Sequence, residues 1–267
     1  MSRVMISGAY GRMGQEIAKA VLAAEDLELV GAVDLFGKGK DVGVLIGTTP
    51  NGVLISDNLS EEISRTKPEI VIDFTVPAAV YDNVVTYLDL GVFPVVGTTG
   101  LTLPAVNDLI ERSARAGIGG LIAPNFALGA VLMMRFAAEA ARFFHDVEVI
   151  ELHHDQKVDA PSGTAQKTVE MILEQRGDFQ QGPPGETESI AGARGGKLAG
   201  GVRIHSVRLP GLVAHQEVLF GGLGQTLSIR HDTISRESFI PGVMLATRKV
   251  KNLKKITYGL EKLLFDS

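Results

Sequence analysis

The residues best suited to chemistry lie together in the segment Glu151–Ala165. Two adjacent histidines, His153 and His154, are followed by Lys157, so three side chains that can hold or transfer a proton stand within five residues. The apolar residues before them indicate a strand, which would place these groups at the end of that strand. The pattern predicts a cluster of positive charge with proton donors.

A helix start follows this cluster. Ser162 is a typical N-cap residue, and Gly163 and Thr164 then open the helix. Backbone N–H groups in the first turn of a helix lack partners within the helix and bind anions. We therefore expect this helix start, together with the cations before it, to form a receptor for a carboxylate.

Two other interpretations of the segment exist. His153, His154 and Asp155 could ligate a metal ion, but adjacent residues rarely point at one ion, and no third ligand stands at helical spacing. The two histidines could also be a surface feature beside an ordinary helix start. We favour the anion receptor with proton donors, and we expect no metal.

A glycine-rich loop near the N-terminus indicates a dinucleotide site. Gly8, Gly11 and Gly14 follow the spacing Gly-x-x-Gly-x-x-Gly, a variant of the usual fingerprint. The apolar strand Val4–Ser7 precedes this loop, and the helical pattern Gly11–Ala24 follows it. Such glycines let the backbone turn sharply and bring N–H groups close to a pyrophosphate. The alternative is a glycine-rich turn without a ligand.

Asp34 ends the second predicted strand, twenty residues beyond Gly14. A carboxylate at this place accepts hydrogen bonds from the ribose of the adenosine. It would repel the 2′-phosphate of NADP, and Leu35 stands where an arginine would help to bind that phosphate. Lys38 and Lys40 add positive charge nearby. We predict that NADH is used at least as well as NADPH.

Three further loops follow predicted strands: Phe74-Thr75, Gly97–Gly100 and Ala123–Phe126. In a parallel sheet the carboxyl ends of the strands share one edge. Each loop alone could be a simple turn, but together with the glycine loop they predict one crevice in which the nicotinamide lies.

The order of the predicted elements places these loops on a parallel sheet. Near-continuous apolar strands alternate with helical patterns through the first half of the chain, which indicates a sheet covered by helices on both faces. The predicted strands are Val4–Ser7, Leu27–Val33, Val53–Ser56, Ile70–Phe74, Pro94–Val96 and Leu121–Ala123. The predicted helices are Gly11–Ala24, one capped by Ser60, Ala78–Leu88 and Leu103–Ala116.

The pattern changes after Ala127. The segment Gln180–Gly201 is rich in glycine and proline and is long for a connection, which indicates a mobile or functional loop. Three strands without helices between them follow this loop, and the turns that join them predict antiparallel neighbours. The elements of this half are a helix to about Phe144, a strand at Val147–Leu152, a helix after Ser162, strands at Val202–Arg208, Val213–Phe220 and Thr226–His231, and a helix from Ser238 to Lys249 before a short tail.

These elements predict the α/β fold class. We expect a Rossmann-like domain with a parallel sheet that binds a nucleotide, and a second, smaller α+β domain. The predicted boundaries assign residues 1–127 plus 237–267 to the dinucleotide-binding domain and residues 128–236 to the second domain.

Composition excludes several classes of protein. The 267 residues carry a formal net charge of −5, which argues against a nucleic-acid partner. The absence of cysteine excludes disulfides, thiolate metal sites and cysteine nucleophiles, and it suits a cytoplasmic protein. The uncharged stretch Gly117–Met134 approaches the length of a membrane span, but its glycines and Pro124 indicate a strand, a turn and a helix start. We expect no membrane partner.

The segment Glu151–Ala165 resembles the signature of the 4-hydroxy-tetrahydrodipicolinate reductase family, formerly called dihydrodipicolinate reductases. That signature is Glu-x-His-His-x-x-Lys-x-Asp-Ala-Pro-Ser-Gly-Thr-Ala, and every fixed position matches. The glycine loop is similar to the family's Gly-x-x-Gly-Arg-Met-Gly, and Gly97–Gly100 and Asn125-Phe126 match its later cofactor loops. The resemblance covers essentially the full length of the chain.

The resemblance implies an enzyme that reduces a cyclic imine dicarboxylate with NADH or NADPH, on the diaminopimelate route to lysine. It implies that His153 is the proton donor and acceptor and that Lys157 is the proton donor. Some members have Glu followed by Arg where this chain has Asp34 and Leu35. The family's second domain binds substrate and forms a homotetramer. The implied substrate contacts are His154, Gly163 and Thr164, and the implied cofactor contacts are Gly8, Ala9, Tyr10, Gly11, Arg12, Met13, Asp34, Gly97, Thr98, Thr99, Ala123, Pro124, Asn125 and Phe126.

Other functions fit parts of the sequence. Tyr258 and Lys262 have the Tyr-x-x-x-Lys spacing of a short-chain dehydrogenase but lie at the C-terminus, and Gly195-Gly196-Lys197 lacks the hydroxyl residue of a Walker loop. Two rivals remain: a related NAD(P)-dependent oxidoreductase that acts on another small acid or sugar, and a non-catalytic dinucleotide sensor. A sensor would not need two imidazoles and an ammonium group beside an anion-binding helix start.

Overall fold

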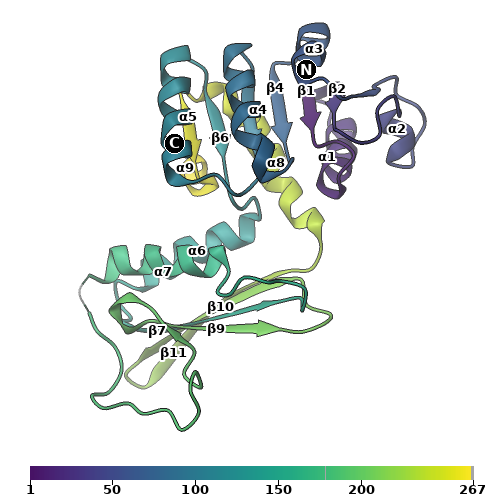
Figure 1. Ribbon diagram of the computed structural model, residues 1–267. Helices are drawn as coiled ribbons and strands as arrows, with labels where there is room; N and C mark the ends of the chain where they lie inside the picture. Colours follow the sequence, from purple (N-terminus) through teal and green to yellow (C-terminus); the bar gives the residue numbers. More distant parts are fainter. Residues whose placement is uncertain (178, 266–267) are drawn as a thin grey trace. The chain divides into compact units, whose positions relative to one another are not determined.

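The structure is a computed structural model, and it describes residues 1–177 and 179–265. The chain forms two compact units (Figure 1). The first unit comprises Met1–Phe126 and Phe239–Ser267, and the second comprises Ala127–Ser238. The predicted domain boundaries lie after residues 127 and 236, and the assignment of a separate role to each unit stays a prediction.

The first unit is built on a seven-stranded parallel sheet with the order β12-β6-β5-β4-β1-β2-β3. The direction of strand order reverses between β4 and β1, which is the switch point at which such sheets bind ligands. The predicted Rossmann-like fold is confirmed. The strands are β1 (Ser2–Ser7), β2 (Leu27–Val33), β3 (Ile55–Ser56), β4 (Ile70–Asp73), β5 (Phe93–Val96), β6 (Gly120–Ile122) and β12 (Ile256–Tyr258).

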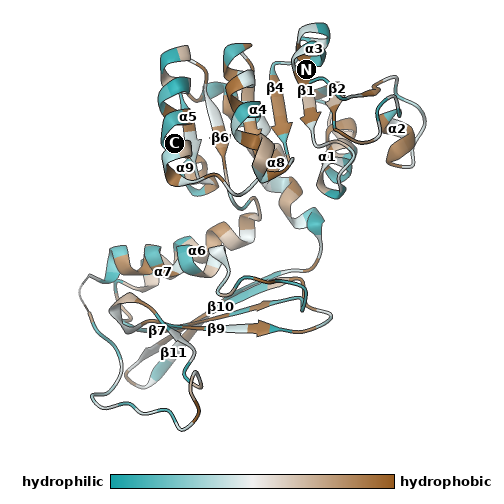
Figure 2. Ribbon diagram, in the orientation of Figure 1, coloured by the Kyte–Doolittle hydropathy of each residue, from teal (hydrophilic) through white to brown (hydrophobic). Residues whose placement is uncertain are grey.

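Helices cover this sheet because its strands are apolar on both faces. Every residue of β4 and β6 is buried, and Figure 2 shows the strands of this unit largely in the colour of hydrophobic residues. A strand of this kind must be covered on two sides to leave water. The helices are α1 (Arg12–Ala23), α2 (Val42–Leu45), α3 (Leu59–Thr66), α4 (Pro77–Asp89), α5 (Leu103–Ala116), α8 (Ile240–Lys249) and α9 (Leu260–Phe265), and the short 3-10 helix η3 (Val250–Asn252) follows α8.

Two local predictions for this unit are wrong. The N-cap of α3 is Asn58, whose side-chain oxygen accepts a hydrogen bond from the N–H of Glu61 at 3.2 Å, so Ser60 lies inside the first turn. The predicted C-terminal tail instead forms β12 and α9. The N–H of Ile256 in β12 donates to the buried hydroxyl of Ser113 at 2.7 Å, which ties this strand to α5. Both features depend on single side-chain contacts that periodicity does not show.

The second unit places two long helices on one face of a five-stranded sheet with the order β11-β10-β7-β9-β8. Its core lies between the helices and that face, and it includes Val149, Val218 and Phe220. The elements are α6 (Leu128–Ala140), β7 (Asp146–His153), α7 (Gly163–Arg176), β8 (Gly196–Lys197), β9 (Arg203–Arg208), β10 (Ala214–Gly222) and β11 (Gln225–Thr233), with the 3-10 helices η1 (Ala199–Gly201) and η2 (Arg236–Phe239).

The order of these strands corrects one prediction. The strands β10 and β11 are antiparallel neighbours as predicted, but β9 and β10 are not neighbours, because β7 lies between them. The strand β7 pairs antiparallel with β10 and parallel with β9. As a result, β7 and β9 end at the same edge of the sheet, where the His153 and Arg208 positions are register partners.

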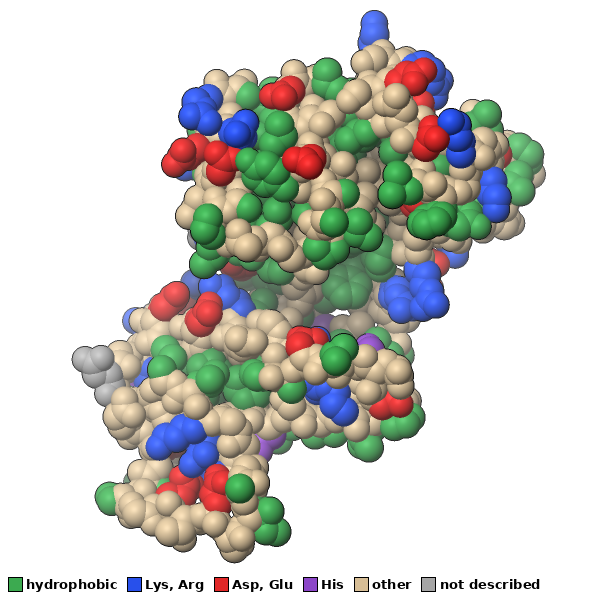
Figure 3. All heavy atoms as spheres, viewed as in Figure 1, with side chains coloured by type: hydrophobic (Ala, Val, Ile, Leu, Met, Phe, Trp, Pro, Cys, Tyr) green, Lys and Arg blue, Asp and Glu red, His purple; other side chains and the backbone are tan. Residues whose placement is uncertain are grey.

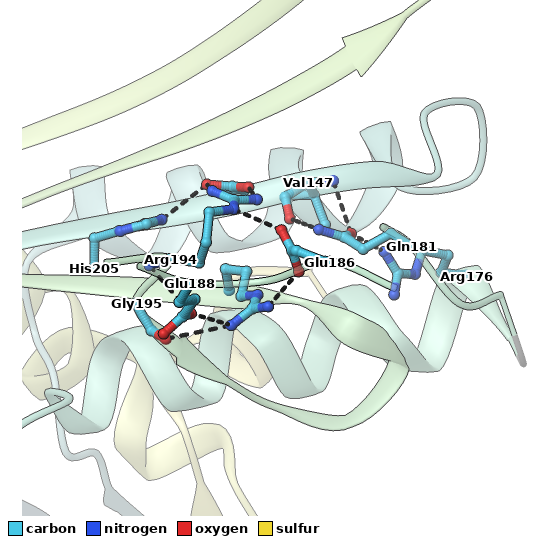
Figure 4. A network of polar contacts seen from close by, with 10 residues as sticks. Val147, Arg176, Gln181, Glu186, Glu188, Arg194, Gly195 and His205 are labelled. Atoms are coloured by element: carbon cyan, nitrogen blue, oxygen red, sulfur yellow. Dashed lines mark hydrogen bonds and ion pairs between the residues drawn. The ribbon is translucent and has the colours of Figure 1, made fainter. Parts of the chain in front are cut away.

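Ion pairs fasten the glycine-rich segment Gln180–Gly201 to the sheet (Figure 4). Arg194 binds both carboxylates Glu148 of β7 and Glu186 of the segment itself. Arg203 of β9 binds the same Glu186 at 2.5 Å. Figure 3 shows basic and acidic side chains next to one another on this part of the second unit. The sequence predicts a mobile or functional loop. In the structure these ion pairs bind the segment to the sheet, while residues 182–193 are exposed.

The uncharged stretch Gly117–Met134 forms β6, a turn and the start of α6, as predicted. Within the part of the chain that the structure describes, no helix is both long and apolar enough to span a membrane.

Candidate functional site

The glycine loop connects β1 to α1 in the predicted way. Gly8 has a φ of +85°, and a Cβ atom there would lie 2.3 Å from the carbonyl oxygen of Phe74, so only glycine fits. Gly11 is the N-cap of α1 and supplies no side chain, which leaves the first N–H groups of the helix open to a ligand. The backbone at this loop therefore fits a pyrophosphate.

Asp34 directly follows β2 and faces this loop. One of its carboxylate oxygens accepts the N–H of Tyr10, and the other accepts the N–H of Phe36, each at 2.9 Å. Lys38 is paired with Asp57 at 2.9 Å. The ammonium group of Lys40 lies over the ring of Tyr10, 4.9 Å from its centroid. The carboxylate is thus held at the end of β2, beside the backbone of the glycine loop.

The loops after β4, β5 and β6 meet at the same edge of the sheet. A Cβ atom on Gly97 would lie 2.1 Å from the ring of Phe74, so the two loops are in close contact. The rings of Phe74 and Phe126 pack against each other with their centroids 5.7 Å apart. The predicted cofactor residues Gly97–Thr99 and Ala123–Phe126 thus directly follow the neighbouring strands β5 and β6, at the edge of the sheet that also carries the switch point.

A buried carboxylate that the sequence analysis did not single out organises these loops. Asp73, the last residue of β4, is fully buried. One carboxylate oxygen accepts the hydroxyls of Thr75 and Thr98, each at 2.7 Å. The other accepts the hydroxyl of Tyr87 at 2.7 Å and the amide of Asn83 at 3.0 Å. Two predicted cofactor loops therefore share one anchor.

The environment of Tyr87 keeps its hydroxyl a donor to Asp73. Burial and the adjacent negative charge of Asp73 raise the pKa of Tyr87 well above its usual value, so this hydroxyl stays a donor. The signal in the sequence was a single acid at the end of an otherwise apolar strand, Ile70–Asp73. A charge in that position must be compensated or it would not be buried.

In the second unit, His153 is the last residue of β7, with 14% of its side chain exposed. Its Nδ1 atom hydrogen-bonds the carboxylate of Glu151, which is fully buried. Arg208, at the end of β9, binds both oxygens of that carboxylate at 2.9 and 2.8 Å. Sequence reasoning gave Glu151 no role and did not single out Arg208, which lies more than fifty residues away.

Lys157 lies in the loop between β7 and α7. Its ammonium group binds both carboxylate oxygens of Asp159, at 2.7 and 2.8 Å. This hydrogen bond lowers the pKa of Asp159. The Lys157 side chain keeps about a fifth of its surface exposed, whereas His154 is exposed as a whole residue. Both groups are therefore accessible to a ligand.

The start of α7 is capped as predicted. The hydroxyl of Ser162 accepts the N–H of Ala165 at 3.2 Å. A Cβ atom on Gly163 would meet no atom of the described residues within 4 Å, so its backbone faces open space. The second unit thus brings His153, Lys157 and the first turn of α7 to one edge of its sheet. Among residues 1–177 and 179–265, no group of three His, Asp or Glu side chains could hold a metal ion.

Family models match nearly the whole chain. Residues 2–126 match the model described as dihydrodipicolinate reductase, N-terminus, and residues 129–264 match the model described as dihydrodipicolinate reductase, C-terminus. The two matches meet near the border between the two compact units.

Curated relatives and solved structures agree. A 4-hydroxy-tetrahydrodipicolinate reductase of Desulfitobacterium hafniense is 52% identical over 98% of both chains. That of Listeria welshimeri is 53% identical over 98% of this chain and 99% of its own. The dipicolinate-bound dihydrodipicolinate reductase from Paenisporosarcina sp. TG-14 is 45% identical, with a TM-score of 0.87 over 98% of this chain and 99% of its own. An amine dehydrogenase from Mycobacterium smegmatis, 14% identical with a TM-score of 0.69 over 97% and 95% of the two chains, shares the fold.

The anchor at Asp73 can be tested by substitution. Asp73→Asn removes the charge and one acceptor, so the loops at Thr75 and Thr98 lose their common support. We expect the dissociation constants of NADH and NADPH to rise together by about tenfold, the effect of roughly 1.4 kcal/mol. Fluorescence titration of the reduced dinucleotides measures both constants.

Asp82→Asn is the matched control, because Asp82 is an exposed acid on the neighbouring helix α4. Its dissociation constants should equal those of the unmodified protein. Unchanged dinucleotide binding in a folded Asp73→Asn variant would contradict the anchoring role.

Proposed function

Because this chain belongs to the dihydrodipicolinate reductase family, it is an NAD(P)H-dependent 4-hydroxy-tetrahydrodipicolinate reductase, and we propose that His153 and Lys157 supply its protons. The reaction forms tetrahydrodipicolinate in the diaminopimelate route of lysine biosynthesis. The observation that carries the residue assignment is the common edge at which β7, the Lys157 loop and the α7 start converge. This family assignment also decides against the sensor and against an oxidoreductase of another substrate class.

The first unit provides the dinucleotide site in this proposal. The close approach of Gly8 to the backbone of Phe74 fixes the course of the glycine loop, and the N–H groups at the start of α1 would hold the pyrophosphate. Asp34 would bind the adenosine ribose. The loops at Gly97–Thr99 and Ala123–Phe126 would hold the nicotinamide end. When bound, the reduced dinucleotide supplies the hydride.

The second unit provides the dicarboxylate site. The N–H groups of Gly163 and Thr164 would bind one carboxylate, since they stand at the start of a fourteen-residue helix whose dipole favours an anion. Lys157 and His154 would bind the other charges of the substrate. Asp159 holds the ammonium group of Lys157 in this structure, so substrate must compete with that carboxylate or share the ammonium group with it.

Two proton-transfer roles follow from the chemistry of the substrate. Its ring must lose a hydroxyl group as water, and a ring atom must be protonated when the hydride arrives. His153 and Lys157 lie at the edge where the ring would bind, and either group can serve the departing hydroxyl. A positioned general acid accelerates such steps by about 10²–10⁴-fold.

Substitution of Lys157 tests this proposal. In Lys157→Ala we expect kcat to fall by about 100-fold or more, because the ammonium proton donor is gone. His154→Gln should mainly raise KM for the substrate, since His154 is assigned to binding. Steady-state assays with 4-hydroxy-tetrahydrodipicolinate measure both effects.

Lys167→Ala is the control, because Lys167 is an exposed lysine of α7 that pairs only with Glu170 among the contacts of the described residues. It should keep normal turnover. Near-normal kcat in Lys157→Ala would refute the proton-donor role.

We propose that NADH serves at least as well as NADPH. The Asp34 carboxylate would repel a 2′-phosphate, and Asp57 already compensates the charge of Lys38. Lys40, over the ring of Tyr10, is the cation left to attract that phosphate within this group. Measured side by side, KM for NADH should not exceed KM for NADPH, and a KM for NADPH about ten or more times lower would overturn the proposal.

We further propose a homotetramer that forms through the second unit. The helices α6 and α7 cover one face of the five-stranded sheet, and the opposite face carries Ile150, Leu152 and Leu219, which stand outside the hydrophobic core. Partly exposed apolar side chains on a sheet face are typical of an interface between subunits.

Light scattering tests the oligomeric state. The expected mass is four times the 28.4 kDa of one chain. Leu219→Asp should reduce the mass, because it replaces an apolar side chain of this sheet face with a charged one. Leu223→Asp should not, because Leu223 is fully exposed at the turn between β10 and β11. A monomer, or equal behaviour of the two variants, would contradict the proposed interface. The cytoplasmic location also stays a prediction, which cell fractionation can check.

A further inference from the structure

A chain of direct contacts joins the two proposed proton-transfer groups. It begins at the imidazole of His153 and passes through the carboxylate of Glu151 to the guanidinium of Arg208. The same guanidinium donates to the backbone carbonyl of Asp159 at 2.8 Å. Asp159 in turn binds the ammonium group of Lys157. Within this series of contacts, Arg208 is the residue that binds both Glu151, the partner of His153, and Asp159, the partner of Lys157.

Sheet register explains how Arg208 reaches this place. The strands β7 and β9 are parallel, and Arg208 is the register partner of His153. Their side chains therefore leave the sheet on the same face and at the same edge. The two terminal nitrogens of Arg208 bind the two oxygens of Glu151 in a fork, and one of them also donates to the carbonyl of Val207 at 2.8 Å. Such a fork fixes the orientation of a carboxylate in a way that a lysine cannot.

The state of Glu151 follows from its partners. Burial would raise the pKa of Glu151, but hydrogen bonds from His153, Arg208 and Ser206 outweigh that effect and lower the pKa to about 2. Glu151 is therefore ionised at neutral pH and can only accept hydrogen bonds. Because it accepts from Nδ1 of His153, that nitrogen carries a proton, and Nε2 is left to exchange a proton with a ligand.

We infer that Arg208 is a positioning residue for the reaction: through Glu151 it sets the tautomer and ring orientation of His153, and through the Asp159 carbonyl it holds the loop that carries Lys157. This inference rests on the proposed roles of His153 and Lys157. In this scheme Arg208 contacts neither the substrate nor the dinucleotide, and it acts only through Glu151 and Asp159.

The second unit contains a matched control for this arrangement. On the other face of β7, Glu148 accepts hydrogen bonds from Arg194 and from Nε2 of His205, the latter at 2.8 Å. This set has the same three residue types, with Glu148 on β7, His205 on β9 and Arg194 in the segment before β8. It contains no proposed site residue. Arg194 even makes an additional ion pair, with Glu186. Loss of Arg194 thus reports the general cost of removing an arginine from such a set.

The first test compares Arg208→Met, Arg208→Lys and Arg194→Met in the full-length enzyme. We expect Arg208→Met to lower kcat by about tenfold or more, as misplacement of catalytic groups does, while the dissociation constant of NADH stays the same. The solvent deuterium isotope effect on kcat should rise, because proton transfer becomes slower. Arg208→Lys should recover only part of kcat, since it restores the charge without the fork. Arg194→Met should keep kcat and the isotope effect of the unmodified enzyme.

A second measurement determines the tautomer in the unmodified protein, and a variant serves only to assign the signal. Nitrogen NMR of histidine-labelled protein reports which ring nitrogen carries the proton, and a His153→Gln sample assigns the signal among the six histidines. The unmodified protein should show His153 protonated on Nδ1. A signal for the neutral tautomer with the proton on Nε2 would overturn the inference.

The kinetic outcomes are equally decisive. A kcat of Arg208→Met within about twofold of the unmodified enzyme would refute the positioning role, and so would an equal loss in Arg194→Met. Failure of the proposed function would look different: the Lys157 variant would keep its turnover, or the unmodified enzyme would not reduce the substrate, while the NMR signal of His153 would still show its proton on Nδ1.

Discussion

A carboxylate that is removed from water must have its charge compensated, and this constraint shapes both halves of the molecule. Asp73 and Glu151 are the fully buried acids at or near the carboxyl ends of β4 and β7. Each is surrounded by donors that come from separate loops or strands. Loss of a donor would leave a buried carboxylate without its hydrogen-bond partner, which costs free energy. The segments that carry the donors are therefore held in place. In the proposed function, one acid thereby arranges the loops that would bind the dinucleotide, and the other arranges the groups that would transfer protons.

The two anchors differ in a way that suits their tasks. Asp73 accepts from neutral hydroxyl and amide groups, so it orders the loops that we propose for the dinucleotide without adding a positive charge to them. Glu151 instead accepts from a guanidinium and an imidazole, which keeps positive charge at the edge where a dicarboxylate would bind. The chain has a net charge of −5, so the attraction of an anionic substrate depends on this local placement of cations.

Much of this arrangement can be predicted from the sequence because its signals are local. Glycine spacing, apolar strands and the Ser162 cap each act over a few residues, and the structure shows the parallel sheet and the α7 start that they predict. The place of β7 between β9 and β10 could not be predicted, because strand order depends on pairing between distant segments. Arg208 escaped notice for the same reason: only the register of two strands brings it to Glu151.

The central claim is that the edge formed by β7, β9 and the start of α7 is a receptor for a doubly ionised heterocycle. Calorimetric titration of the full-length protein with pyridine-2,6-dicarboxylate tests this most directly, with and without NADH. We expect one molecule to bind per chain, in competition with substrate, more tightly when NADH is present and more weakly in Lys157→Ala. If the dicarboxylate does not bind, or binds equally well to the Lys157→Ala variant, the receptor is not where we have placed it.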